Sequence, residues 1–111
     1  MIKHIVMWNV SGEDAAARAS NLALVKAEFE SLRGRIPGLL NLEIGVDESR
    51  IDYACDVVLY SEFTSRVALA NYAEHPEHLR VKRALGNLRT ARHQVDYEVP
   101  GGAVSPELAI P

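Results

Sequence analysis

Residues 39–63, LLNLEIGVDESRIDYACDVVLYSEF, contain the clearest strand pattern in the sequence. Leucine, isoleucine and valine alternate with polar residues or glycine over 39–47, and this period of two predicts a strand with one buried face. The polar segment 47–52 predicts a turn. The mostly apolar run 53–63 predicts a second strand, covered on both faces and paired with the first.

A strand and a long helix are predicted on the N-terminal side of this pair. Residues 2–10 are rich in β-branched and other apolar residues, which predicts a strand. Ser11 is expected to cap the following helix, and Gly34 with Pro37-Gly38 predicts its end. The buried face of the helix is predicted from apolar residues at steps of three and four: Leu22, Val25, Phe29, Leu32 and Ile36.

Two short helices and a last strand are predicted on the C-terminal side. Thr64-Ser65 offers an N-cap to the first helix, and Pro76 ends it because proline disfavours helix at the preceding residue. Pro76 also suits the first position of the second helix. Alternation over 93–99 predicts the last strand. The order β-α-β-β-α(α)-β is typical of the ferredoxin-like α+β fold, with helices on one face of a four-stranded antiparallel sheet.

The strand patterns place apolar residues on both faces of this sheet. Ile5, Met7, Val58 and Tyr60 are expected on the face opposite the helices. That face is too apolar to be left in water. We therefore expect a homodimer with two sheets packed face to face, which is a dimeric α/β barrel.

Length and composition limit the classes of protein. The 111 residues fit one domain, expected over 1–100, followed by a tail over 101–111. A net charge of −3 argues against a nucleic-acid partner. The single cysteine excludes an internal disulfide framework and suits a reducing cytoplasm. No apolar run approaches the roughly 18 residues of a membrane span, and no signal peptide is recognised, so we expect a cytoplasmic protein that does not contact membranes.

Five short motifs run in order from the first predicted strand to the last. They are MIKHIV (1–6), IPGL (36–39), SEF (61–63), YAEHPEH (72–78) and VDYEV (95–99). Together they resemble the stress-responsive α/β barrel (Dabb) family over residues 1–99. The resemblance implies a dimeric α/β barrel and says little about the reaction.

One branch of that family, the plant polyketide cyclases, closes a linear tetraketide by aldol chemistry without a metal or organic cofactor. This sequence has Val57 where that branch has a histidine, and its first helix has Phe29 and no tyrosine. The resemblance implies four candidate catalytic residues at matching positions: His4, Tyr72, His78 and Asp96.

These residue types suit proton transfer next to a carbonyl. A neutral imidazole accepts a proton near neutral pH, and a tyrosine hydroxyl donates to an oxygen on which charge grows. His78 is then the base, with Asp96 as its candidate partner, while Tyr72 and His4 bind or polarise the carbonyl oxygen. One difficulty is that Asp96 points away from the helices if Val95 faces them, unless the strand carries a bulge.

Each candidate residue also has a structural interpretation. His4 fits a core histidine bonded to the backbone, and His78 fits a cap beside Pro76. His75 and His78 have the i,i+3 spacing of metal ligands, but Pro76 separates them and no motif supplies a third ligand. We expect no metal and no cofactor, and we assign His75 to the turn before Pro76.

A mostly apolar ligand pocket is expected between the sheet and the helices. Trp8 fits a ring flanking a ligand or a core residue equally well. Cys55 is expected to be structural, and Asp56 to serve the strand edge or the dimer. The residues expected to line the pocket are Val6, Trp8, Phe29, Val57 and Leu59. A basic cluster is interpreted as a solvated helix face and strand start: Arg80, Lys82, Arg83, Arg89 and Arg92.

Three functional hypotheses remain open from the sequence. The first is a homodimer that binds a small apolar or carbonyl-containing ligand, with cofactor-free aldol or cyclase chemistry. The second is a non-enzymatic, stress-associated structural dimer whose pocket is closed by side chains. The third is a cofactor-free oxygenase of the wider dimeric-barrel superfamily.

Overall fold

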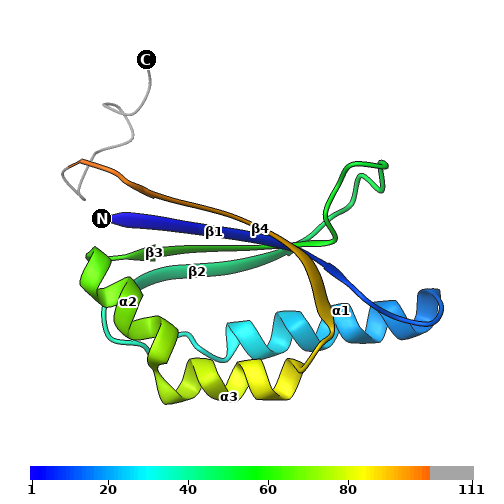
Figure 1. Cartoon of the computed structure of the whole chain (residues 1–111), viewed down its shortest axis with the longest axis horizontal. Helices are drawn as coiled ribbons and strands as arrows, with labels where there is room; N and C mark the ends of the chain where they lie inside the picture. Colours follow the sequence, from blue (N-terminus) through cyan, green and yellow to red (C-terminus); the bar gives the residue numbers. More distant parts are fainter. Residues whose placement is uncertain (101–111) are drawn as a thin grey trace.

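A four-stranded antiparallel sheet carries three helices on one face in the computed structural model, which describes residues 1–100 (Figure 1). The strands lie in the order β2-β3-β1-β4, with the first and last strands in sequence adjacent to each other. This is the expected ferredoxin-like α+β fold. The elements are β1 (Ile2–Val10), α1 (Ala15–Glu30), β2 (Leu39–Val46), β3 (Val57–Phe63), α2 (Arg66–Glu74), α3 (Pro76–Leu85) and β4 (Arg89–Glu98).

Helix α1 is shorter than the apolar period suggested. It is capped by Asp14, whose side chain accepts from the Ala17 N–H at 2.8 Å, whereas Ser11 donates to the Leu88 carbonyl at 3.3 Å. The helix ends at Glu30, and Leu32 and Ile36 are buried in the turns that follow it. Apolar spacing therefore predicted burial beyond the last hydrogen-bonded turn of the helix.

The break between α2 and α3 is where proline predicts it. Ser65 caps α2 by accepting from the Ala68 N–H at 3.1 Å. His75 caps α3, because its Nδ1 accepts from the Glu77 N–H at 3.1 Å, and Pro76 is the first residue of that helix. The expected role of His75 in this turn is confirmed.

The core lies between the helices and one face of the sheet. Val6, Trp8, Leu59 and Phe63 point from the central strands β1 and β3 toward the helices and are almost fully buried. Phe29 of α1 stacks on the Trp8 ring with 5.4 Å between centroids. Burying large aromatic and aliphatic side chains of this kind contributes about 1.5–3 kcal/mol each.

The opposite face of the sheet is uncovered and apolar. Met7 on β1 and Val58 on β3 are direct neighbours on it, as expected. On β4, Val95 pairs with Ile5 and is 57% exposed. Strand β4 therefore turns its apolar residues away from the helices, contrary to the orientation considered for Val95. Its helix side is polar and exposed because β4 is an edge strand of the sheet.

A β-bulge interrupts β4 opposite Trp8. Met7 pairs with His93 and Asn9 pairs with Thr90, so two residues of β4, Ala91 and Arg92, oppose one residue of β1. Ala91 has a φ of 51°, a left-handed conformation that costs a non-glycine residue about 1–2 kcal/mol. An extra residue reverses the alternation of side chains along the strand.

Asp56 was expected to serve a strand edge or the dimer. In the structure it is buried instead, and it joins three parts of the chain. Its Oδ2 accepts from the Val10 N–H at 2.8 Å, and its Oδ1 accepts from Arg18 at 2.9 Å and from Arg50 at 3.3 Å. It is 7% exposed. A buried carboxylate with these partners ties the start of β3 to β1 and α1.

Removing this carboxylate is expected to destabilise the fold. In Asp56→Ala the Val10 N–H and two guanidinium groups lose their acceptor, which costs about 2–3 kcal/mol. Urea denaturation measures the loss, and Asp52→Ala, at an exposed position of the same loop, is the control. Equal stability of the two variants would contradict this role for Asp56.

Candidate active site

A cavity of about 360 Å³ lies on the helix side of the sheet, between β1, β4, α2 and α3. It brings together the four residues expected to be catalytic, from four different elements. Its lining consists of His4, Leu69, Ala70, Tyr72, Ala73, His78, Lys82, Arg89, Arg92, Gln94 and Asp96. We call this cavity the helix-side pocket.

A chain of hydrogen bonds runs along the β4 wall of the pocket. His4 Nδ1 donates to Asp96 Oδ1 at 2.5 Å, and Gln94 Nε2 donates to Asp96 Oδ2 at 2.9 Å. Gln94 in turn accepts from Arg92 Nε at 3.0 Å. Asp96 is thus the partner of His4 and not of His78. Because its Nδ1 carries the shared proton, only Nε2 of His4 remains for a ligand.

His78 is held from the backbone of the preceding helix. Its Nδ1 donates to the Ala73 carbonyl at 3.0 Å, which leaves Nε2 as a proton acceptor in the neutral ring. The ring lies 4.3 Å from the Tyr72 ring between centroids. Burial lowers the pKa of His78, and the positive charges of Lys82, Arg89 and Arg92 lower it further, while the bond to Ala73 opposes this. The imidazole is therefore neutral at pH 7.

The titration of His78 is directly measurable. By NMR, the midpoint for its ring protons is expected below the ordinary 6.5, because burial disfavours the charged form. At a pH between the lowered pKa of His78 in the folded chain and its ordinary value of 6.5, the unfolded chain binds more protons than the folded chain. The contribution of this group to stability is therefore complete above 6.5 and is lost as the pH falls through the folded pKa. A midpoint at or above 6.5 would contradict the burial of the ring.

Tyr72 is buried at the centre of the site. Burial raises the pKa of its hydroxyl well above the ordinary value, although the charges of Arg89 and Arg92 act in the opposite direction. The phenol therefore stays protonated at neutral pH and is available as a hydrogen-bond donor to a ligand. Its neighbours are the rings of His78 at 4.3 Å and His4 at 6.3 Å between centroids.

The expected apolar lining forms the deep end of the site and leaves little space. The residual void at this depth is about 20 Å³, too small for a ligand, so these side chains act as a packed floor. Of the apolar set, Val57 does not line either of these spaces. The floor is made by Val6, Trp8, Phe29 and Leu59. The open part of the pocket is accordingly more polar than expected.

The basic cluster is predicted to be solvated, and Lys82 and Arg92 are exposed as predicted, whereas Arg89 is half-buried. Lys82, Arg89 and Arg92 all line the pocket. The guanidinium carbon of Arg89 lies 4.7 Å from the Trp8 ring centroid, and that of Arg92 lies 5.7 Å from it. Both arginines face the helices because the bulge reverses the alternation between them. The basic residues were visible in the sequence, but the bulge that turns them inward was not.

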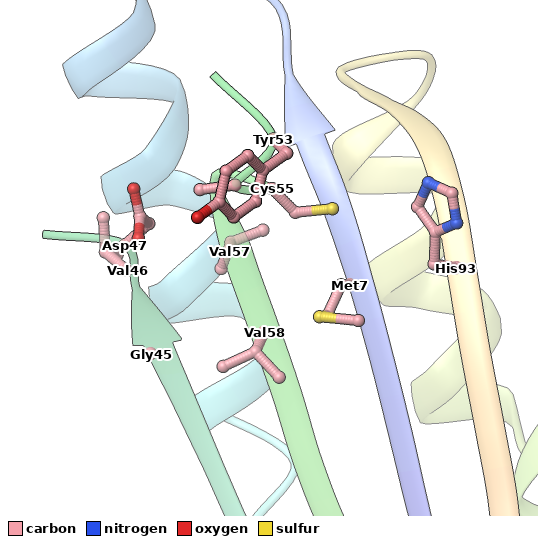
Figure 2. A pocket seen from close by; sticks show the side chains of 10 residues that line it. Met7, Gly45, Val46, Asp47, Tyr53, Cys55, Val57, Val58 and His93 are labelled. Carbon is pink, nitrogen blue, oxygen red and sulfur yellow. The ribbon is translucent and has the colours of Figure 1, made fainter. Parts of the chain in front are cut away.

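A second cavity, of about 580 Å³, lies on the uncovered face of the sheet. Figure 2 shows Met7, Val58 and His93 on three neighbouring strands, with Tyr53 and Cys55 from the segment before β3 at one end. Of the expected site residues it contains only Val57. It lies across the sheet from the His4–Asp96 pair and Tyr72, so it is a feature of the apolar face and not of the candidate active site.

Within residues 1–100, no three histidine, cysteine or acidic side chains meet in an arrangement suited to a metal ion. None of the helices there has the length and apolarity to cross a membrane.

The family model of the stress-responsive A/B barrel domain matches residues 2–99, nearly the whole described chain. The chain belongs to the stress-responsive A/B barrel (Dabb) family. This agrees with the resemblance seen in the motifs of the sequence. Comparison with curated proteins gives no match.

Solved structures place this Dabb protein among ferredoxin-like proteins. A dimeric protein of unknown function from Bacteroides fragilis is 27% identical, with a TM-score of 0.78 over 88% of this chain and 95% of that one. The hydroxynitrile lyase of Passiflora edulis is 14% identical, with a TM-score of 0.73 over 90% and 94%. An antibiotic biosynthesis monooxygenase is 19% identical, with a TM-score of 0.67 over 89% and 98%. The last two similarities concern the fold alone.

Proposed function

We propose that this Dabb protein binds a small carbonyl compound in the helix-side pocket and catalyses cofactor-independent proton transfer, leading to aldol-type bond formation. The observation that carries the proposal is the convergence of His78, Tyr72 and the His4–Asp96 pair around one cavity of about 360 Å³. A base and hydrogen-bond donors are the groups that enolate formation needs.

In the proposed reaction, His78 Nε2 removes a proton from the carbon next to the carbonyl. The electron pair of the broken C–H bond forms the enolate, and the Tyr72 hydroxyl donates to the oxygen as its charge grows. His4, oriented by Asp96, binds the second carbonyl. The enolate carbon attacks that carbonyl carbon, and the imidazolium of His78 returns its proton to the new alkoxide.

The open cavity favours this proposal over a purely structural dimer. A structural role predicts a pocket closed by side chains, whereas about 360 Å³ of open space lies beside His4 and Tyr72, within the size range of small-molecule sites. The neutral state of His78 at pH 7 supports its use as a base. The oxygenase hypothesis predicts oxygen uptake with an electron-rich phenol, which an oxygen electrode tests separately.

We propose that the working unit is a homodimer formed through the uncovered face of the sheet. That face exposes Met7, Val95 and Tyr97, which are 37%, 57% and 44% exposed. Three similar structures, one of them the Bacteroides fragilis protein, are described as dimeric.

We further propose that residues 1–100 form the domain that carries the site, and that the protein is cytoplasmic. The tail over 101–111 lies outside the described residues.

Deuterium exchange tests the proposed proton transfer. The ketone 4-phenylbutan-2-one is incubated with the protein in D₂O, and proton NMR follows the loss of the signals next to the carbonyl. Exchange faster than in buffer alone is expected, and equal exchange with and without protein would contradict the proposal.

A further inference from the structure

Arg89 is a half-buried cation with no ion-pair partner within residues 1–100. Its Nε is buried and makes no hydrogen bond. No ion pair of the described residues includes Arg89, Arg92 or Lys82. Burial and the neighbouring charge of Arg92 lower the pKa of Arg89, which is the response of a cation that lacks an anion.

The one carboxylate of the pocket lining does not neutralise these charges. Asp96 accepts from His4 with one oxygen and from Gln94 with the other. The pocket therefore presents three basic side chains, and its acidic group is already engaged. The buried Nε of Arg89 lacks an acceptor, which is costly, and three cations line one cavity, so the arrangement suits an anion supplied from outside.

A strained backbone conformation at Ala91 places two of these cations, Arg89 and Arg92, on the same face of the sheet. Without the bulge at Ala91, regular alternation would place Arg89 on the opposite face of the sheet from Arg92. The left-handed conformation of Ala91 is unfavourable for alanine, yet it puts both guanidinium groups on the helix side.

From this geometry we infer that the helix-side pocket binds ligands carrying a carboxylate, which Arg89 and Arg92 hold beside Tyr72 and His78. The inference rests on the proposed function for the ligand's carbonyl group and adds an acidic group to it, which makes the substrate class a small keto acid. The planar guanidinium groups match a carboxylate in shape, and Arg89 is fixed in place by its stacking on Trp8.

A matched pair of ketones tests the inference: 4-oxopentanoate and its neutral amide, 4-oxopentanamide. Binding is measured by NMR titration. We expect the acid to bind about 10- to 100-fold more tightly than the amide, which is the usual contribution of a hydrogen bond to a charged group. The affinity of the acid should fall as salt is added, because salt screens the attraction between the charges. Arg89→Met is expected to remove this preference for the acid.

Two further variants keep the test decisive. Arg92→Met, at an exposed position, is expected to reduce the preference for the acid even if Arg89→Met fails to fold. Arg83→Met, on the exposed surface of α3, is the matched control and should behave like the wild type. Equal binding of acid and amide to the wild-type protein would overturn the inference.

The outcomes separate this inference from the proposed function. Equal affinities together with His78-dependent deuterium exchange would reject the anionic ligand and leave the proton transfer in place. Preferential binding of the acid without exchange would reject the proposed reaction and support the anion site. Absence of both would reject both.

Discussion

Replacing His78 with alanine is expected to lower the rate of deuterium exchange into 4-phenylbutan-2-one by about 10²–10⁴-fold. In the proposed reaction His78 Nε2 is the group that takes the proton, and its Nδ1 is already engaged by the Ala73 carbonyl. Tyr72 would still bind the oxygen. The ketone should therefore bind the variant with similar affinity while exchange is lost.

The control for this variant lies on the same helix. Arg83→Met changes an exposed residue of α3 that does not line the pocket, so it should exchange the ketone at the wild-type rate. Wild-type exchange should also fall as the pH drops through the lowered pKa of His78, because protonation blocks the base. Undiminished exchange by His78→Ala would show that another group removes the proton.

A charged residue at position 95 is expected to separate the proposed dimer. Val95 lies on the uncovered face, paired with Ile5, and is 57% exposed in the single chain. In Val95→Asp the fold should remain intact. Two carboxylates, one from each copy, would be buried without partners in the interface, which should weaken the dimer by about 100-fold or more.

Light scattering coupled to size-exclusion chromatography measures this effect. The wild-type protein should show twice the mass of one chain, and Val95→Asp should show the mass of one chain. Val67→Asp makes the same substitution at an exposed valine of α2, on the helix side, and should stay dimeric. A wild-type monomer, or a dimeric Val95→Asp protein, would contradict the proposed interface.

The sequence predicted the fold well because its signals are local. The alternation over 39–47, the apolar run that becomes β3 and the proline between α2 and α3 each specify a conformation over a few residues. Strand boundaries were less accurate. Strand β3 begins at Val57 and β4 at Arg89, because residues 53–56 join the loop and the alternation of β4 is interrupted by the bulge.

The candidate site was predictable in its residues and less so in its contacts. His4, Tyr72, His78 and Asp96 do line one cavity. The pairing of Asp96 with His4 follows from their direct opposition on β1 and β4. Strand register is set by contacts far apart in the chain, so the sequence alone left the direction of Asp96 open.

The inward direction of Arg89 was not predictable from the sequence. A basic residue at a strand start is usually solvated, and Ala91 carries no glycine or asparagine signal for a left-handed conformation. The conformation becomes understandable only with Trp8 and Phe29 beneath the guanidinium group, at 4.7 Å and 5.3 Å from their ring centroids.

The most direct test of the proposed site is a crystal structure of the protein grown with 4-phenylbutan-2-one. The ligand is expected in the helix-side pocket, with its carbonyl oxygen accepting from the Tyr72 hydroxyl and its neighbouring carbon facing His78. A ligand bound instead against Met7 and His93 on the uncovered face, or a helix-side pocket closed by its own side chains, would contradict this account.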